Sequence, residues 1–346
     1  MDGCGAEWIE VYDGGDYDRV QTLGVDARGN VIAAGYTRTG ATYAFWVSKY
    51  DAEGQEQWTV EGPGVAQSVA TDNDGNVVVS GYSERAERWI RKYGSNGDED
   101  WTIEGGEPLP GIAIDPEGSI LVAASGMGAT KYDAQGEELW TSLDDSSSST
   151  ALASDRSGNV LLVGSVEREE GAVDGFNPHT DVVVRKLDPD GVELWVRSYD
   201  GGRDDSGHAI AVDGSDAVFV VGRSRLETTG GSVGDLGWIR KYSSTGEVIW
   251  TRTEEAAGPR DIGNKIAIAS DGSVLVAWLG LFSYDEDGSL LGTLACRADH
   301  VAFAPSGSML LAGSVELPSD SFLQLSDVWL GARAIGLHTS FSPRGG

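Results

Sequence analysis

The chain repeats one small unit along almost its whole length of 346 residues. The unit is clearest between Trp195 and Trp250, where two runs rich in Val and Ile, HAIAVD and AVFVVG, flank a cluster of Asp and Gly. This combination predicts two strands joined by a tight hairpin. A second hairpin follows, in which WIRKY and EVIW flank SSTG, and Gly246 can take the positive φ that such a turn requires. Four strands form one antiparallel meander that is too small to bury both faces alone, so the unit must stack on its copies.

The first hairpin occurs seven times, at steps of roughly 35 to 57 residues, which lie in the range typical of propellers and solenoids. Its copies read LGVDARGNVIAAG, VATDNDGNVVVSG, IAIDPEGSILVAA, LASDRSGNVLLVG, IAVDGSDAVFVVG, IAIASDGSVLVAW and VAFAPSGSMLLAG. The second hairpin recurs as KYDAEGQEQW, KYGSNGDEDW, KYDAQGEELW, KLDPDGVELW and KYSSTGEVIW. A sixth copy, SYDEDGSLLG, is degraded, and the seventh lacks its end.

The chain begins with EWIEVYDGGD, which matches the start of the unit's last strand. We therefore expect Trp8 to Tyr12 to complete the seventh blade, which begins near His300. An open solenoid would not account for an extra strand at one end of the chain and a missing strand at the other. The sequence thus predicts an all-β fold, a seven-bladed β-propeller of four-stranded antiparallel blades. The N-terminal strand joins the last blade and closes the ring, which leaves no long exposed sheet edge.

The repeat also bears on domain organisation. A length of 346 residues would ordinarily suggest two domains, but the repeat runs nearly end to end and predicts a single propeller domain over 1–346. The expected blades span 20–62, 66–105, 109–144, 149–199, 207–254, 264–295 and 299–335, with the closing strand at 8–12.

Two series of residues fit this packing. Two residues before the Asp of each first hairpin, or its equivalent, the side chain is always small, as neighbouring innermost strands near a propeller axis require: Gly24, Ala70, Ala113, Ala153, Ala211, Ala267 and Ala302. The outer counterpart is a series of tryptophans that we interpret as core wedges between blades rather than as a carbohydrate platform: Trp8, Trp58, Trp101, Trp140, Trp195 and Trp250.

The charge is strongly acidic, with 25 basic and 55 acidic residues and a net charge of -30. No basic stripe is present, which disfavours nucleic acid and anionic membranes as partners, and we expect a monomer. Five of the six lysines fall at one repeat position, where we expect each to extend its stem between blades and to pair with an acid: Lys49, Lys92, Lys131, Lys186 and Lys241.

No segment approaches the roughly 18 apolar residues of a membrane helix, so membrane insertion is not expected, and the start MDGCGAEW lacks the pattern of a signal peptide. The chain is either cytoplasmic or exported with its signal removed, and we prefer export. Cys4 and Cys296 flank opposite ends of the seventh blade in this assignment. The resulting separation of about 15 Å exceeds the roughly 7 Å between bridgeable Cα atoms, which predicts two free thiols.

The pattern of Trp, YDGG, GHAIAVD, VFVVG and KY, and especially YDGGDYD and YDGGRDD before the inner strand, resembles the SBBP repeats of bacterial β-propellers over residues 7 to 315. The resemblance implies a secreted, periplasmic or surface-attached bacterial protein, often without assigned chemistry. The run KYDAQGEELW is also similar to repeats of PQQ-like propellers. Dehydrogenases of that group use a vicinal cysteine pair, which this sequence lacks, whereas a cofactor-free scaffold similar to outer-membrane assembly propellers stays open.

The longer connections all join strands two to three or four to one, and therefore lie on the face opposite the tight Asp and Gly turns. They are 165–181 in blade four, 224–235 in blade five and 254–264 entering blade six. Long loops collected on a rigid ring are where function concentrates. We expect the binding surface on this face, with the candidate residues Glu169, Glu170, His179, Arg203, Asp204, His208 and His300.

No nucleophile elbow, zinc-binding helix motif or phosphate loop occurs, and catalytic residues are not assigned. Acidic residues in Gly-rich loops suit calcium, and the candidate ligands are Asp13, Asp16, Asp18, Asp200, Asp204 and Asp205. The pair Asp72 and Asp74 in DNDGN resembles half of a calcium loop, although turn formation explains it as well. No other cofactor is expected.

Three functions compete. The first is a non-enzymatic binding or scaffold propeller outside the cytoplasm that holds a protein or glycan on the long-loop face. The second is a lyase or hydrolase with His208 and His300 at the channel mouth. The third is a structural ring within a larger surface protein.

Overall fold

The computed structural model describes residues 8–14, 17–106, 111–124, 126–144, 147–168, 179–201, 204–227, 233–255, 265–277, 280–294, 298–316 and 326–333. These residues form 28 strands and contain no helix, as expected for an all-β chain. Within the same ranges, no helix is long and apolar enough to cross a membrane.

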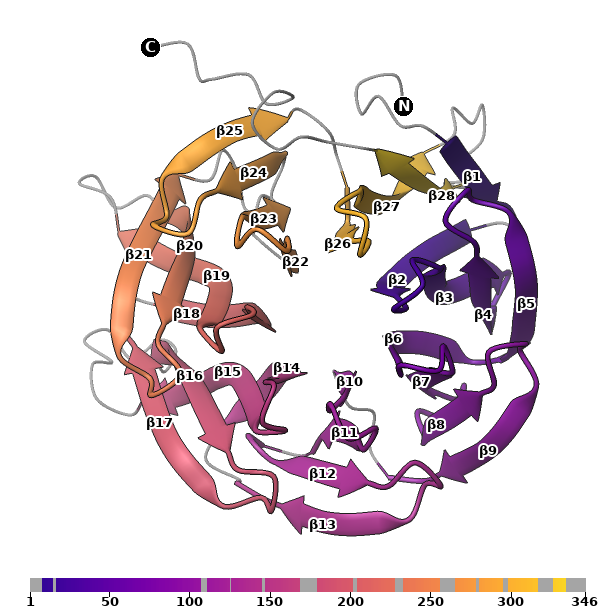
Figure 1. Ribbon diagram of the computed structural model, residues 1–346, viewed down its shortest axis with the longest axis horizontal. Helices are drawn as coiled ribbons and strands as arrows, with labels where there is room; N and C mark the ends of the chain where they lie inside the picture. Colours follow the sequence, from indigo (N-terminus) through magenta and orange to yellow (C-terminus); the bar gives the residue numbers. More distant parts are fainter. Residues whose placement is uncertain are drawn as a thin grey trace. The chain divides into compact units, whose positions relative to one another are not determined.

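The chain divides into two compact units, of which the first comprises residues 1–114 and 291–346 and the second residues 115–290. Both consist of antiparallel meanders of consecutive strands (Figure 1). The strands of the first unit are β1 (Trp8–Tyr12), β2 (Tyr17–Val25), β3 (Val31–Thr39), β4 (Thr42–Tyr50), β5 (Glu56–Pro63), β6 (Val65–Thr71), β7 (Val77–Tyr82), β8 (Arg88–Tyr93), β9 (Glu99–Glu104), β10 (Ile112–Ile114), β26 (His300–Phe303), β27 (Met309–Glu316) and β28 (Ser326–Arg333). The expectation of a single domain over 1–346 stays a prediction.

The strands of the second unit are β11 (Ile120–Ala123), β12 (Ala129–Tyr132), β13 (Glu138–Ser142), β14 (Ser148–Ser154), β15 (Val160–Arg168), β16 (His179–Leu187), β17 (Glu193–Tyr199), β18 (Asp204–Val212), β19 (Val218–Glu227), β20 (Val233–Tyr242), β21 (Val248–Glu255), β22 (Lys265–Ile268), β23 (Val274–Ala277) and β24 (Leu281–Tyr284). The remaining strand, β25 (Leu290–Leu294), begins at the last residue of this unit.

The N-terminal strand pairs as the sequence suggests. In the first unit β1 lies antiparallel to β28, with Trp8 opposite Ala332 and Tyr12 opposite Val328. It therefore stands beside the meander β26–β27–β28, which has only three strands of its own. The number of seven blades and the closure of a ring stay predictions.

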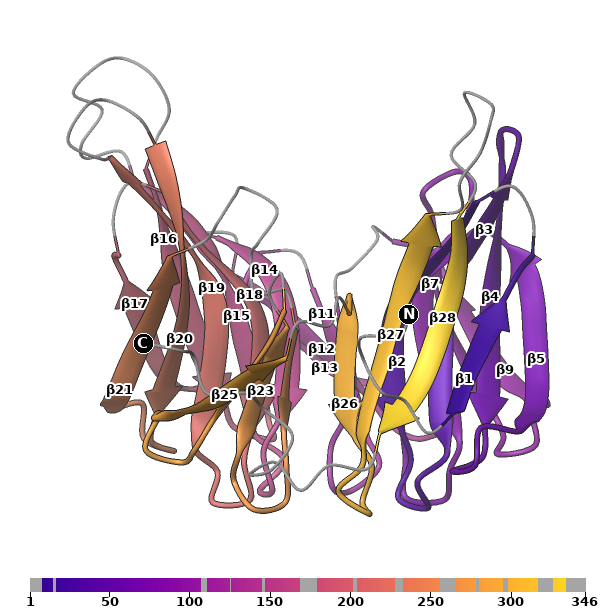
Figure 2. The same ribbon diagram turned by 90° about the horizontal axis from the view of Figure 1, so that it is seen from above.

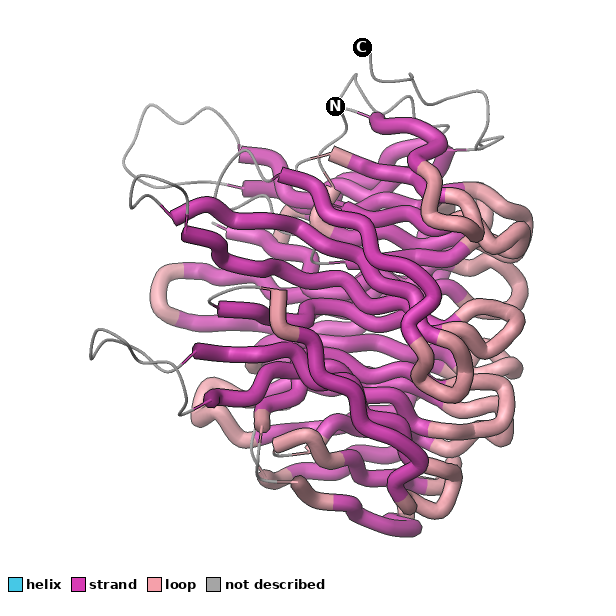
Figure 3. The backbone as a smooth tube through the Cα atoms, turned by 90° about the vertical axis from the view of Figure 1, so that its left-hand side faces the viewer, coloured by secondary structure: helices cyan, strands magenta, loops and turns pink. Residues whose placement is uncertain are grey.

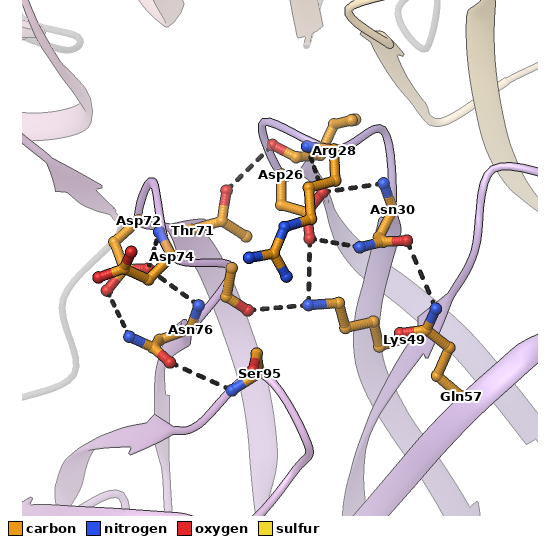
Figure 4. Close-up of polar contacts among 12 residues, drawn as sticks. Asp26, Arg28, Asn30, Lys49, Gln57, Thr71, Asp72, Asp74, Asn76 and Ser95 are labelled. Carbon is orange, nitrogen blue, oxygen red and sulfur yellow. Dashed lines mark hydrogen bonds and ion pairs between the residues drawn. The ribbon is translucent and has the colours of Figure 1, made fainter.

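Asp side chains build the tight turns of the first hairpins. Asp26 Oδ1 accepts hydrogen bonds from the backbone N–H groups of Arg28 and Asn30, both at 2.9 Å, and Gly29 takes the positive φ of 87° that the turn needs. Asp72 forms the same pattern with Asp74 and Asn76 (Figure 4). The carboxylate of Asp72, the first Asp of DNDGN, thus accepts hydrogen bonds from its own turn. Turn formation explains this run without a metal ion.

The turns of both hairpins lie at one end of the strands. Figure 2 shows this for the first unit, and Figure 3 shows it for the second. Within each meander, the connections from strand two to strand three consequently lie at the opposite end, called the long-loop end below.

A glycine in the second strand of four meanders faces a β-bulge in the first strand. At Gly222 a Cβ atom would lie 2.1 Å from the carbonyl oxygen of Ser206 and 2.4 Å from Cζ2 of Trp238. The register of β18 and β19 shifts at this point, between Gly207 and Ala209. The same close approach and bulge occur at Gly35, Gly81 and Gly164.

One of the predicted small residues and four of the predicted tryptophans pack between neighbouring meanders. A Cβ on Gly24 would lie 3.1 Å from Cγ1 of Val69 in the next innermost strand of the first unit. In the second unit, Trp250 donates its indole N–H to the carbonyl of Glu286 at 3.0 Å and contacts Gly288. Trp58, Trp140 and Trp195 make the equivalent contacts with the second hairpin turn of the next meander.

The most deeply buried tryptophans belong to a different position that the sequence reading did not single out. Trp46, Trp89 and Trp238 lie in the third strands β4, β8 and β20 and are at most 3% exposed. The core of each unit is therefore built around the third strands as well as around the wedges.

Four of the five lysines at the repeat position pair with acids as expected. The closest pairs are Lys186 with Asp155 at 2.7 Å and Lys131 with Asp115 at 2.8 Å. Lys49 and Lys241 form the corresponding pairs with Asp26 and Asp213.

Candidate functional site

The segments YDGGDYD and YDGGRDD fold alike. The last Asp of each, Asp18 in β2 and Asp205 in β18, is 0% exposed. The backbone N–H of Gly14 donates to Asp18 Oδ2 at 3.0 Å, and that of Gly201 donates to Asp205 Oδ2 at 2.6 Å. Each segment is thus a short loop held by the carboxylate that follows it.

The tyrosine of each segment packs on a buried tryptophan. The ring centroids of Tyr12 and Trp46 are 4.5 Å apart, and those of Tyr199 and Trp238 are 4.9 Å apart. This packing brings the tyrosine hydroxyl over the first glycine, where a Cβ would lie 2.8 Å from the hydroxyl in one copy and 2.6 Å in the other. The motif YDGG therefore has a structural basis in both places.

Each segment also leads into a bridge between two meanders. Tyr17 of β2 pairs in parallel with Ser326 of β28, and Asp204 of β18 pairs in parallel with Thr180 of β16. These pairings merge two meanders into one sheet in each unit. In the second unit they bring the start of β18 to the start of β16, at the long-loop end.

Three carboxylates meet at this junction in the second unit. Asp181 of β16, Asp200 after β17 and Asp205 of β18 each offer an oxygen, and these oxygens lie within 4.8 Å of one another. Asp181 is 3% exposed and Asp205 is 0% exposed, whereas Asp200 lies on the surface. The oxygen-only ligand set suits a hard cation such as calcium.

The surroundings of the cluster raise the pKa of both buried acids. Burial raises the pKa of Asp205, hydrogen bonds from the hydroxyl of Ser224 and the N–H of Gly201 lower it, and the charges of Asp200 and Asp181 raise it. Burial also raises the pKa of Asp181, against the opposing charge of Arg168. The guanidinium of Arg168 forms an ion pair with Asp181 Oδ2 and is 49% exposed.

The two copies of the segment place a hydroxyl side chain opposite the buried acid. Thr37 donates its hydroxyl to Asp18 Oδ1, so both oxygens of Asp18 accept hydrogen bonds. Ser224 occupies the same register position opposite Asp205, and a hydrogen bond from its hydroxyl lowers the pKa of that carboxyl. Both copies therefore place a hydroxyl side chain of the second strand against the buried acid.

Of the predicted calcium ligands, the structure brings Asp200 and Asp205 together. Asp204 lies apart from this cluster, with Oδ2 3.6 Å from Nη1 of Arg225. The expectation that Asp18, Asp204 and Asp205 lie in loops was wrong, because β2 and β18 pair with β3 and β19 up to these residues. Asp13 is exposed beside β1, and Asp16 lies outside the described residues.

Of the predicted binding residues, only some can be placed. His179 is half-buried at the start of β16 and pairs in register with Arg168 of β15. His208 of the second unit lies with Nε2 2.8 Å from Oγ of Ser206, and His300 of the first unit is 7% exposed in β26. Glu169, Glu170 and Arg203 lie outside the described residues, as do Cys4 and Cys296.

The sequence reading missed Asp181, which is the third member of the cluster. Its signal is weak, because an Asp at the start of a third strand has the appearance of a solvated strand end. The available clue was its position two residues after His179, at the end of the longest connection.

No family model matches this sequence, and no curated protein matches it. Three solved structures are similar in fold. The Neurospora crassa Pan2 WD40 domain has a TM-score of 0.61 and 13% sequence identity, with 92% of this chain and 90% of that chain covered. The WD40 β-propeller domain of Doa1 has a TM-score of 0.59 and 15% identity, with 94% of this chain and 97% of that chain covered. BamB from Moraxella catarrhalis has a TM-score of 0.55 and 14% identity, with 94% of this chain and 98% of that chain covered. At these identities the likeness shows the fold alone, and the fold is a β-propeller of four-stranded antiparallel sheets.

Proposed function

We propose that this chain is a non-enzymatic binding or scaffold propeller that holds a protein or glycan at the long-loop end of its blades. We further propose seven blades, a ring closed by β1 on β28, and the SBBP-repeat family of secreted or cell-surface bacterial proteins. The pairing of β1 with β28 supports closure, and the YDGG segments support the family. The proposed protein is a monomer. It is not proposed to bind nucleic acid or to insert into a membrane.

The observation that carries the binding function is the extension of five strands in the second unit. Strands β15, β16 and β18 have 9 residues and β19 and β20 have 10, whereas β11, β12, β22, β23 and β24 have 4. The parallel pair of Thr180 and Asp204 places the extended ends of two meanders together.

The extended ends carry charged side chains. Glu167 and Arg168 are exposed at the end of β15, His179 lies opposite Arg168, and Arg225 of β19 lies opposite Asp204. These strand ends form a rigid surface that carries both positive and negative side chains. Such a surface is suited to polar recognition, because the strands position the side chains before the partner arrives.

A charge reversal tests this placement. Partners captured from culture supernatant, and glycans on an array, are compared for the unchanged chain, Glu167→Lys and Glu247→Lys. Glu247 is also exposed but follows a tight turn at the opposite end. We expect Glu167→Lys to lose the captured partner and Glu247→Lys to keep it. Equal capture by all three proteins, or equal loss in both variants, would contradict the placement.

An enzyme, either lyase or hydrolase, is the alternative, and one contact favours it. Ser206 Oγ and His208 Nε2 are 2.8 Å apart on one strand, the arrangement of a nucleophile and its base. A fluorophosphonate probe labels serines activated in this way. Labelling that Ser206→Ala abolishes would favour the hydrolase, and an unlabelled protein would remove this argument for it.

A further inference from the structure

We propose that a cluster of tyrosines and arginines at the long-loop end of the first unit binds a uronic acid residue of an acidic glycan. This Tyr–Arg cluster consists of Tyr17, Arg19, Tyr36, Arg38 and Tyr43. The inference rests on the proposed function in placing a glycan at the long-loop end. It concerns the first unit, whereas the charged strand ends described above belong to the second.

The five side chains share one face of the sheet β2–β3–β4. In register, Arg38 stands opposite Tyr17 of β2 on one side and opposite Tyr43 of β4 on the other. Tyr36 stands opposite Arg19. Directly opposed residues of an antiparallel pair project from the same face, as do residues two apart on one strand. The cluster therefore lies where β2 begins, β3 ends and β4 begins, at the end opposite the tight turns (Figure 2).

The three tyrosine rings form a continuous group that reaches the surface. The ring centroids of Tyr17 and Tyr36 are 6.3 Å apart, and those of Tyr36 and Tyr43 are 5.5 Å apart. Tyr43 is 37% exposed, and the other two rings are half-buried. Rings with an apolar body and a polar tip suit contacts that are apolar on one side and wet on the other. A pyranose ring, with its C–H face and its hydroxyl rim, has the matching surface.

The second unit shows what an arginine at this position normally contacts. Arg225 holds the place of Arg38, and its register partners on the neighbouring strands are Asp204 and Asp235. Its Nη1 lies 3.6 Å from Oδ2 of Asp204. In the first unit tyrosines stand at both of these partner positions. Arg38 therefore has the setting of an ion-paired arginine, with aromatic rings in the place of the acids.

The guanidinium of Arg38 has hydrogen-bonding capacity that its neighbours leave unused. Its Nε is buried and has no hydrogen-bond partner among the described residues. Its Cζ lies 5.7 Å from the ring centroid of Tyr17, and such a cation–π contact uses the face of the guanidinium rather than its N–H donors. Buried donors are normally paired, and a planar carboxylate pairs with the fork of an arginine through two parallel hydrogen bonds. A carboxylate from a ligand would supply this partner.

The cluster is a positive site on an acidic protein. Arg19 and Arg38 bring two cations to one face of a chain whose net charge is -30. Burial raises the pKa of Tyr36, the charge of Arg19 and its hydrogen bond lower it, and Tyr17 and Tyr43 raise it. The groups that act most on this hydroxyl are thus an arginine and two tyrosines. An anion is attracted to such a site, while the acidic surface elsewhere repels it.

A uronic acid fits both parts of the cluster better than an acidic peptide does. It carries its carboxylate on a rigid ring whose C–H face can stack on a tyrosine. The carboxylate of an aspartate or glutamate sits on a flexible stem, which offers no face to the three rings and loses rotamer freedom on binding. We therefore assign the rings to the sugar face and Arg38 to the carboxylate, with Arg19 adding a second positive charge.

The test uses the full-length chain and an array of oligomers of galacturonic, glucuronic, mannuronic and guluronic acid. Each oligomer is printed beside its carboxyl-reduced, neutral counterpart, and peptides of glutamate and aspartate are printed on the same array. Isothermal titration then measures the oligomer with the strongest signal. We expect carboxyl reduction to weaken binding at least about tenfold, because charge-assisted hydrogen bonds are lost. Binding should also weaken as the salt concentration is raised.

Four variants locate the glycan. Arg38→Gln should weaken uronate binding at least about tenfold, and Tyr43→Ala should weaken it about threefold or more. Tyr43→Phe keeps the ring and should bind within about twofold of the unchanged chain. Arg28→Gln is the matched control, because it makes the same charge change at an exposed arginine in a tight turn at the opposite end. Thermal unfolding checks that each variant is folded, and Tyr43→Ala, at an exposed position, probes the site without the buried Nε.

Three results would overturn the proposal: no binding to any uronate, binding that survives carboxyl reduction or Arg38→Gln, and capture of the acidic peptides in place of uronates. None of them bears on the charged strand ends of the second unit, which Glu167→Lys tests separately. If Glu167→Lys kept its partner while uronate binding depended on Arg38, the placement in the second unit would fail and this site would stand.

Discussion

Lys49 and Asp26 form a buried ion pair, with Nζ 3.1 Å from Oδ2 and side chains that are 1% and 0% exposed. The same ammonium donates to the backbone carbonyl of Gly75 in the next meander at 2.8 Å (Figure 4). Asp26 in turn organises its own hairpin turn. One lysine therefore links the turn of its own meander to the turn of the neighbouring meander.

Removing only the cation should be strongly destabilising. Lys49→Met leaves the carboxylate of Asp26 buried and without its counter-charge, and we expect a loss of about 3–5 kcal/mol in the free energy of unfolding. The double variant Lys49→Met with Asp26→Asn should recover part of this loss, because the amide oxygen still accepts the turn hydrogen bonds. Urea unfolding measures both, with Arg85→Met as an exposed control. Strictly additive losses in the double variant would contradict the pairing.

The aspartates of these ion pairs also predict that the protein loses stability at acidic pH. Burial alone would raise the pKa of Asp155, but hydrogen bonds from Lys186 and Asn159 lower it below its usual value. The pKa of Asp26 and of Asp213 is lowered by comparable hydrogen bonds that outweigh burial. An acid whose folded pKa is depressed stabilises the protein above its unfolded pKa and loses this contribution as the pH falls through the folded value.

The free energy of unfolding should therefore fall as the pH drops below about 4, the ordinary pKa of an aspartate. Asp155→Asn should be less stable at pH 6 and should lose less stability between pH 5 and pH 3 than the unchanged chain. Glu247→Gln, at an exposed position, should keep the original slope. Urea unfolding at several pH values checks both, and parallel slopes in all three proteins would refute the assignment.

Gly222 should tolerate no side chain. A Cβ at this position would collide with backbone at Ser206 and with the buried ring of Trp238, and neither can move without disrupting the bulge between β18 and β19. We expect Gly222→Ala to cost about 2–4 kcal/mol in unfolding free energy. Gly214→Ala is the control, because its nearest neighbour is the flexible end of Arg156 at 3.2 Å. A loss at Gly222 as small as that at Gly214 would show that the bulge can relax.

Much of this fold could be predicted from the repeat, because strand pairing within a meander follows from short local segments. The pairing of β1 with β28 was also predictable, since Trp8 begins a copy of the last strand of the unit. The bulges were not predictable, because an extra residue in one strand leaves no mark in an alternating pattern.

The candidate site was half predictable for a related reason. Asp200 and Asp205 stand in one local motif, whereas Asp181 comes from a strand that reaches them only through the parallel pairing of β16 with β18.

The contact of Trp250 with the next hairpin turn should appear as a coupling energy. Trp250→Phe removes the hydrogen bond to the carbonyl of Glu286 and should cost about 1 kcal/mol. Gly288→Ala adds a Cβ that would lie 2.8 Å from the indole, so part of its cost should vanish when the indole is replaced by the smaller ring.

A double-mutant cycle on these two residues should therefore give an interaction free energy of about 0.5–2 kcal/mol. Gly272→Ala offers the matched cycle, since Gly272 has a similar positive φ of 84° and no atom within 4 Å of its added Cβ. Its cost should add to that of Trp250→Phe without coupling. If the Gly288 cycle were also additive, the tryptophan would not be the wedge that holds neighbouring meanders together.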